Sequence, residues 1–161
     1  MNRLIIGISG ASGVQFGVRA LVLLAPLPIE THLVMSRSAE LTVHHELDMS
    51  LADLRALADQ WHPIKNVGAS IASGSFRNMG MLIAPCSIRT LGEIVSGVTS
   101  TLLTRSADVA LKERRPLVLM VRETPLHLGH LRNMVAATEM GAIIAPPVPA
   151  FYTRPKSVDA L

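Results

Sequence analysis

The residues best suited to chemistry follow short apolar runs of the sequence, where small, hydroxyl-bearing and charged side chains replace hydrophobic ones. Hydroxyls and backbone N–H groups at such positions bind phosphate oxygens, and an arginine adds a charge-assisted partner. One carboxylate, Glu123, stands among them, and nothing in the set resembles a metal cage. The set therefore indicates a phosphorylated ligand. Its segments are Gly10-Ala11-Ser12, Ser36, Cys86-Ser87-Ile88-Arg89-Thr90, Arg122-Glu123 and a tail that contains Tyr152.

The first of these segments lies between a predicted buried strand, residues 4–8, and a predicted helix. Apolar residues recur at helical spacing from Val14 to Val22. A tight turn of four small residues that leads into a helix aims N–H groups at an anion, so it favours phosphate binding. Ser12 is placed to cap this helix or to hold a ligand oxygen. A plain turn, whose glycines serve only its sharp geometry, is the alternative.

Predicted strands and helices alternate along the whole chain, which we interpret as a single domain, residues 1–161. This alternation predicts an α/β fold with a three-layer, doubly wound, mostly parallel sheet. Ligands of such sheets bind beyond the carboxyl ends of the strands. The long aperiodic stretch 60–76 is expected to be a functional loop. Further strands are predicted at 31–35, 81–84, 117–121 and 142–145, and helices at 39–47, 51–59, 88–95, 101–112 and 127–140.

Composition narrows the classes of partner. Charged residues make up 17% of the chain, so we expect sister subunits of a homo-oligomer to cover much of the surface. The net charge of +3 comes without a long basic run, which argues against nucleic acid. The longest apolar stretch, residues 20–29, contains two prolines and is too short to span a membrane. The single cysteine, Cys86, fits a reducing cytoplasm.

A closer resemblance is carried by five stretches: GISGASG at 7–13, SGSF at 73–76, APCSIRTL at 84–91, LLTRSADVALKERRPLVLMVRETP at 102–125 and PAFYTRPKSV at 149–158. On these stretches the chain resembles the flavin prenyltransferases of the UbiX type, including those once described as phenolic acid decarboxylase B subunits. The resemblance runs from the first strand almost to the last residue. It implies a flavodoxin-like or Rossmann-like fold and assembly as a dodecamer.

The resemblance also implies a reaction. A dimethylallyl group passes from dimethylallyl monophosphate to reduced FMN and forms a fourth ring across flavin N5 and C6, without a metal. The product, prenylated FMN, serves a partner decarboxylase of the UbiD type. FMN and dimethylallyl monophosphate are therefore the cofactor and substrate that we expect.

Residue roles follow from the same resemblance. Ser36 and Ser87 are assigned to FMN, although ordinary helix caps remain an equal alternative for both. Glu123 matches a carboxylate that exchanges protons with the leaving phosphate, Glu46 matches one that lines the same cavity, and Ser12 matches a proton relay. The full set expected to hold FMN is Gly10, Ala11, Ser12, Ser36, Ser87, Ile88, Arg89, Thr90 and Arg122.

The allyl phosphate is expected to meet cations, because charge accumulates on the leaving phosphate. By resemblance, Lys112 and Tyr152 are phosphate ligands, Arg105 is lent by a neighbouring subunit, and Ser73-Gly74 belongs to the substrate site. We interpret Arg114 and Arg115, which follow Lys112, as a solvated helix end favoured by the helix dipole.

Three departures from the family pattern stand out. Members usually have a C-terminal helix that carries another phosphate-binding arginine, and we expect this helix to be missing from the chain. Arg132 stands where members commonly have a glutamate. Trp61 lies too far upstream to match the tryptophan that precedes Ser-Gly-Ser in some members.

The sequence also has features that suit other functions. Glycines of the first turn resemble a dinucleotide fingerprint, and Tyr152 and Lys156 have the spacing of short-chain dehydrogenases, which would suit an NADP-dependent reductase. Pro155 argues against the helix that this spacing needs. A flavin-dependent cysteine decarboxylase relative and a passive FMN carrier are the remaining alternatives. His127 and His130 are interpreted as caps or surface residues, and Cys86 as a packed thiol.

Overall fold

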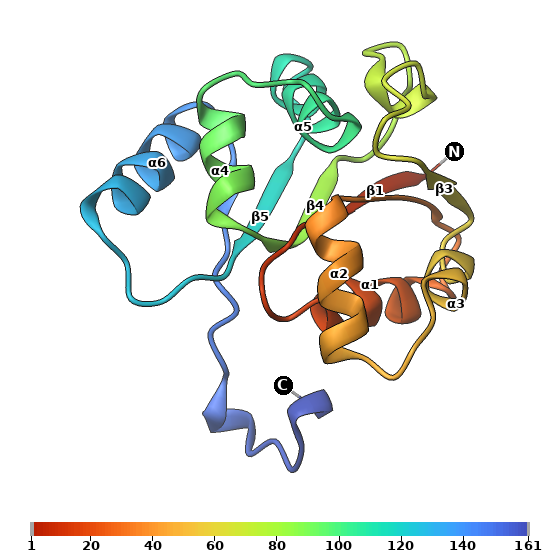
Figure 1. Ribbon diagram of the computed structural model, residues 1–161, viewed down its shortest axis with the longest axis vertical. Helices are drawn as coiled ribbons and strands as arrows, with labels where there is room; N and C mark the ends of the chain where they lie inside the picture. Colours follow the sequence, from red (N-terminus) through yellow and green to blue (C-terminus); the bar gives the residue numbers. More distant parts are fainter. Residues whose placement is uncertain (1, 161) are drawn as a thin grey trace.

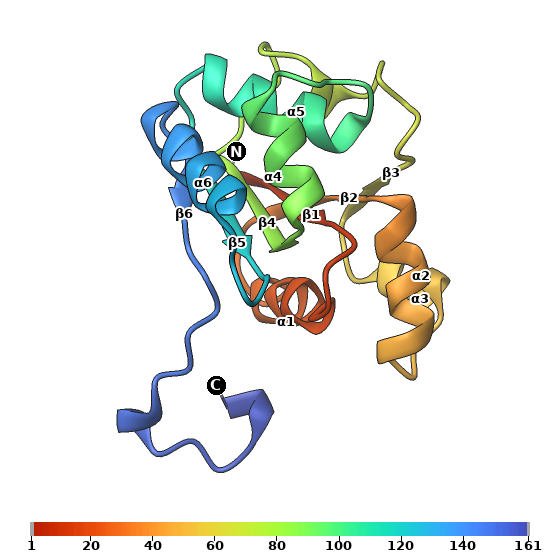
Figure 2. The same ribbon diagram turned by 60° about the vertical axis from the view of Figure 1, so that its left-hand side comes forward.

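Six parallel strands form one sheet in the order β3-β2-β1-β4-β5-β6 (Figures 1 and 2). The computed structural model describes residues 2–160. The chain builds the sheet outward from β1 to β3, then returns across it and continues on the other side from β4. The strands are β1 (Arg3–Ile8), β2 (Glu30–Met35), β3 (Gln60–His62), β4 (Met81–Cys86), β5 (Leu117–Val121) and β6 (Ile143–Ile144).

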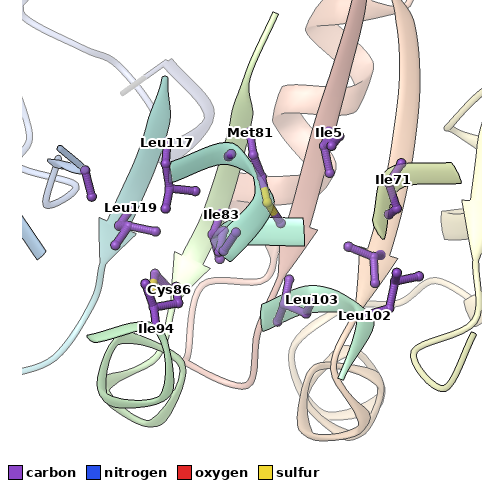
Figure 3. Packing of buried hydrophobic residues seen from close by; sticks show 14 of the residues in the cluster. Ile5, Ile71, Met81, Ile83, Cys86, Ile94, Leu102, Leu103, Leu117 and Leu119 are labelled. Atoms are coloured by element: carbon purple, nitrogen blue, oxygen red, sulfur yellow. The ribbon is translucent and has the colours of Figure 1, made fainter. Parts of the chain in front are cut away.

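Helices cover both faces of the sheet, which confirms the doubly wound α/β prediction. One face carries α1 (Gln15–Leu24), α2 (Arg37–Glu46) and α3 (Leu51–Ala56). The other carries α4 (Ile88–Val95), α5 (Leu102–Lys112), α6 (Leu128–Glu139) and the 3-10 turn η1 (Ser70–Ala72). Figure 3 shows aliphatic side chains of β1, β4 and β5 packed against α4, α5 and η1.

The protein has a hydrophobic core on each face of the sheet, and successive side chains of a strand point alternately into one core or the other. Ile6 and Ile8 of β1 pack toward α1 and α2, whereas Ile5 packs toward α5 and η1. Each is at most 2% exposed. Because these strands are apolar on both faces, their sequences read as continuous hydrophobic runs.

Several predicted elements differ from the structure. The stretch 60–76 is not all loop, because it begins with the edge strand β3. Strand β4 does not stop at Pro85 but continues to Cys86 across a shift in register, a place where a sheet tolerates proline. Val22 is 42% exposed and does not share the buried face of α1. Helix α3 ends three residues before the predicted Asp59.

The switch point of the sheet lies between β1 and β4, because the strand order runs outward from there in opposite directions, to β3 on one side and to β6 on the other. A buried side chain joins the two carboxyl ends at this point. Ser9 Oγ donates to the Pro85 carbonyl oxygen over 2.9 Å and accepts from the Ser87 N–H over 2.7 Å. The ends of β1 and β4 are therefore fixed to each other where a ligand would bind.

The chain after β6 leaves the sheet as an extended tail (Figures 1 and 2), and residues 147–149, Val158 and Ala160 of this tail line a cavity together with α1. The tail contains two short 3-10 turns, η2 (Phe151–Thr153) and η3 (Val158–Ala160). Phe151 and Tyr152 are 72% and 90% exposed. Of the helices in residues 2–160, none is long and apolar enough to cross a membrane.

Candidate active site

Two cavities lie at the carboxyl ends of the strands, one on each side of the first turn. The first has a volume of about 620 Å³, and we call it the carboxylate cavity. Ser12 and Gly13 contribute to it from the turn after β1, Glu46 from the end of α2, and Arg122-Glu123 from the residues after β5. Ser12 and Glu123, which are expected to move protons, therefore share one cavity with Arg122 and with Glu46, which is expected to line it.

Glu46 is anchored on the first turn. Its Oε2 accepts hydrogen bonds from the N–H groups of Gly13 over 2.8 Å and Val14 over 3.2 Å. Burial alone would raise the pKa of Glu46, but hydrogen bonds from Ser12, Gly13 and Val14 and the positive charge of Arg122 together lower it. Glu46 is consequently a carboxylate at neutral pH.

This arrangement corrects one expectation about the turn. Ser12 does not cap α1, since the N-cap is Val14 and makes no side-chain cap bond. The carboxylate of Glu46 instead takes the N–H groups at the start of the helix, where negative charge is favourable. Gly13 has a φ of +98°, which a side chain would disfavour, so the glycine is needed for this turn.

The second cavity has a volume of about 310 Å³, and we call it the hydroxyl cavity. The N-caps of three helices line it: Ser36 of α2, Ser87 of α4 and Thr101 of α5. Each helix N-terminus presents N–H groups and partial positive charge, so their convergence favours an anion such as phosphate. The remaining lining residues are Gly10, Arg37, Ser38, Ile64, Lys65, Arg89, Thr90, Glu93 and Ser100.

Ser36 and Ser87 are helix caps and cavity-lining residues at once. Ser36 Oγ accepts from the Ala39 N–H, and Ser87 Oγ accepts from the Thr90 N–H, each over 3.1 Å. A hydroxyl that accepts a cap bond still carries a proton to donate. The two interpretations are thus compatible for Ser36, whereas Ser87 Oγ donates its proton to Thr90 Oγ1 over 3.0 Å and would have to redirect it toward a ligand. Gly10 is required beside them, because a Cβ there would lie 2.2 Å from the Cβ of Ser38.

The expected substrate residues gather elsewhere, around the segment 72–76. Arg105 Nε donates to the Ala72 carbonyl oxygen over 3.2 Å, and Lys112 Nζ lies against Gly74 and pairs with Glu113. In the described chain, neither Arg105 nor Lys112 is among the residues that line the two cavities. Lys112 precedes β5 and Glu123 follows it, which separates them along the strand by about 13 Å at roughly 3.3 Å per residue.

Tyr152 is not brought to either group. It lies in the extended tail and is 90% exposed. Arg154, two residues further on, has a left-handed φ of +52°, so no helix joins Tyr152 to Lys156. The spacing that suggested a dehydrogenase is therefore not realised on a helix.

Comparisons with known proteins fit this geometry. The "Flavoprotein" family model matches residues 1–151. The chain is 62% identical over 160 residues to the flavin prenyltransferase UbiX of Escherichia coli K12, covering 99% of this chain and 85% of that protein. The chain belongs to the UbiX family of flavin prenyltransferases.

Solved structures of UbiX-type proteins have the same fold. The crystal structure of AnUbiX (PadA1) in complex with FMN and dimethylallyl pyrophosphate matches with a TM-score of 0.97 and 49% identity, over 98% of this chain and 84% of that one. A dodecameric FMN-dependent UbiX-like decarboxylase from E. coli O157:H7 matches with a TM-score of 0.96 and 48% identity, over 98% and 86%.

Within this UbiX-family chain, three side chains have other roles. Burial raises the pKa of the Cys86 thiol to about 12, which is that of a packed and unreactive residue. His127 caps α6 by accepting from the His130 N–H, and the two rings stack. No cluster of three or more His, Cys, Asp or Glu side chains that could hold a metal occurs in residues 2–160.

Two residues that fix the backbone around these sites escaped sequence reasoning. Ser9, which fixes the switch point, is one hydroxyl among several in the first turn and has no pattern of its own. Arg115 is half-buried and donates to two carbonyl oxygens of the segment 72–76, so its interpretation as part of a solvated helix end is wrong.

Proposed function

We propose that this chain transfers a dimethylallyl group from dimethylallyl monophosphate to reduced FMN. The observation that carries the proposal is the single turn 9–14, which contributes Gly10 to the hydroxyl cavity and Ser12 and Gly13 to the carboxylate cavity. A phosphate-binding site thereby adjoins a group of acid–base side chains. Membership of the UbiX family supports the same activity.

The hydroxyl cavity suits the phosphate of FMN. Three helix N-termini and the hydroxyls of Ser36 and Thr90 offer donors, and Arg37 offers positive charge, whereas Arg89 is paired with Glu93 over 2.8 Å. Gly10 lets the turn pack closely against Ser38, which also lines this cavity. Ala11 and Ile88 flank these positions in sequence, and Ile88 packs on the core. Reduced FMN supplies the nucleophilic N5 and C6 atoms.

The carboxylate cavity is suited to manage charge and protons. Arg122 lies beside Glu46 and offers positive charge to an anion. Glu123 can donate a proton to the phosphate oxygen when the allylic C–O bond breaks, and can take back the proton that ring closure releases. Ser12, which donates to Glu46, can pass that proton between flavin and carboxylate.

A second subunit completes the site in this proposal. Arg105 and Lys112, with Ser73-Gly74, supply the cations and small groups that hold the phosphate of the substrate, and Tyr152 on the extended tail adds a hydroxyl. The family resemblance supports a dodecamer, and one solved relative is dodecameric. We further propose that prenylated FMN is handed to a UbiD-type decarboxylase and that the reaction takes place in the cytoplasm.

One anaerobic assay tests the activity. The purified protein, reduced FMN and dimethylallyl monophosphate are mixed, and the flavin is followed by absorbance and mass spectrometry. We expect a flavin heavier by one dimethylallyl unit, with or without a strong chelator. An unmodified flavin, or a product that forms only after a divalent ion is added, would contradict the proposal.

A further inference from the structure

The segment 72–76 is held against the end of α5 by a forked contact from one side chain. Arg115 Nη1 donates to the Phe76 carbonyl oxygen over 2.8 Å, and Nη2 donates to the Gly74 carbonyl oxygen over 2.7 Å. A guanidinium donates in such a fixed, planar fork, which a lysine cannot reproduce. The two bonds fix both ends of the peptide Gly74-Ser75-Phe76.

The backbone after α5 aims Arg115 at this segment. The Arg114 N–H donates to the Leu111 carbonyl oxygen over 3.0 Å, and the Arg115 N–H donates to the Ala110 carbonyl oxygen over 2.8 Å. Arg114 has a left-handed φ of +54°. These features form a Schellman motif, which turns the chain sharply at the end of a helix. Arg115 therefore has a set direction relative to α5.

The same segment lies directly beneath the proposed phosphate-binding lysine. A Cβ on Gly74 would be only 2.8 Å from Lys112 Nζ, so the ammonium rests on the glycine. Ser73 Oγ lies 2.9 Å from Ser75 Oγ within the same turn. Any shift of the segment 72–76 would consequently move Ser73, Gly74 and the surface that supports Lys112.

We propose that Arg115 is a positioning residue for the allyl phosphate site: its fork holds Ser73, Gly74 and Lys112 in one arrangement. This inference rests on the proposed function, because it presumes that these three residues meet the substrate. The guanidinium of Arg115 donates to protein carbonyl oxygens, and it contacts no reacting atom in this scheme. Its effect should appear in substrate binding and leave FMN binding unchanged.

The test compares Arg115→Gln with Arg114→Gln. Both variants lose one positive charge at neighbouring positions, but only the first loses the forked contact. For Arg115→Gln we expect the KM for dimethylallyl monophosphate to rise by about 10-fold or more, from the loss of two charge-assisted bonds. We expect kcat to change by less than about twofold, since uniform binding is lost, and FMN affinity to stay that of the parent. Arg114→Gln should match the parent in all three quantities.

A second measurement needs no catalysis. The Ser73 N–H donates to the carbonyl oxygen of Ser70, just before the segment, and the Phe76 N–H donates to that of Ser73 within it. Their hydrogen exchange should be about 10-fold faster in Arg115→Gln and unchanged in Arg114→Gln.

If the parent forms no prenylated flavin, the proposed function fails. Parent-like exchange and KM in Arg115→Gln, with an active parent, would overturn the positioning role alone. If Arg115→Gln does not fold, Arg115→Lys decides: an unchanged KM there would overturn the need for the fork.

Discussion

Two glutamates share the carboxylate cavity but differ in what holds them. Glu46 Oε2 is bound by two backbone N–H groups, whereas Glu123 Oε1 accepts from the N–H of the next residue, Thr124, over 3.0 Å. A carboxylate held by N–H groups and beside Arg122 is stabilised in its charged form. Glu46 therefore holds the turn, and in the proposed reaction Glu123 is the carboxylate left to exchange the proton.

Replacing Glu123 by glutamine separates chemistry from binding. Glutamine keeps the shape of the side chain but cannot carry the proton, so Glu123→Gln should bind FMN and allyl phosphate nearly as the parent does. Its single-turnover rate should fall by about 10²- to 10⁴-fold, the usual contribution of a general acid–base. Stopped-flow absorbance at saturating ligand measures this rate. An unchanged rate with weakened FMN binding would assign Glu123 a purely structural part.

Sequence patterns located some of these residues and not others. Ser12, Arg122 and Glu123 follow apolar strands, so their meeting at one edge of the sheet could be predicted. Glu46 ends a helix, where a glutamate is ordinarily solvated, and only the family resemblance indicated it. Arg115 could not be found at all, because a helix that ends without glycine shows no sign of the Schellman motif that directs it.

At the scale of elements, the strands with long apolar runs could be predicted from the sequence, and the short strand at the edge of the sheet could not. The strand 117–121 was predicted with its correct ends, because it carries no polar residue. β3 has only three residues, of which Gln60 and Trp61 are exposed, so no alternation marks it. Its pairing with β2 depends on contacts distant in sequence. Local periodicity cannot report such contacts.

The end of α5 offers a stability test at this scale. Arg114 occupies the left-handed position of the Schellman motif, which costs a side chain about 1 kcal/mol and glycine almost nothing. Arg114→Gly should therefore raise the free energy of unfolding by about 0.5–1 kcal/mol, as urea unfolding would measure. Leu111→Gly, inside the helix, is the opposite control and should destabilise. A loss of stability in Arg114→Gly would mean that the Arg114 side chain makes a stronger contact than its backbone costs.

At the scale of the whole molecule, a pair formed by the buried His32 and the half-buried His62 connects the sheet to the segment 72–76. His32 of β2 stacks on His62 of β3 with ring centroids 5.2 Å apart, and the Nδ1 of His32 lies 2.9 Å from the Nε2 of His62. The ring of His32 also meets Phe76 edge-on, and its Nε2 lies 3.0 Å from Glu30 Oε1. Arg3 pairs with Glu30. Three strands and the substrate segment thus share one cluster.

This pair predicts a pH dependence of stability. Burial, and then the charge of His32, lower the pKa of His62 below its ordinary 6.5. As pH falls through that value the unfolded chain binds a proton that the folded chain resists, so the free energy of unfolding should decrease. His62→Gln should flatten the change in Tm between about pH 8 and about pH 5.5, while the exposed control His44→Gln should keep it. If Tm changes equally with pH in His62→Gln and in the parent, His62 is not the source of the pH dependence.

The separation of Lys112 and Arg105 from the two cavities predicts that each site draws on two chains. Equal mixtures of chains, reassembled together, can test this for Arg105→Ala and Glu123→Gln. With the two changes on different chains, random assembly leaves about a quarter of the sites with both native residues, provided that each residue comes from a different subunit. If one chain supplied both, that mixture would have no intact site.

The control places both changes on the same chain and mixes it with the parent. A shared site again leaves about a quarter of the activity there, whereas a site within one chain leaves about half. Activity in the control mixture alone would place Arg105 and Glu123 in the same subunit's site.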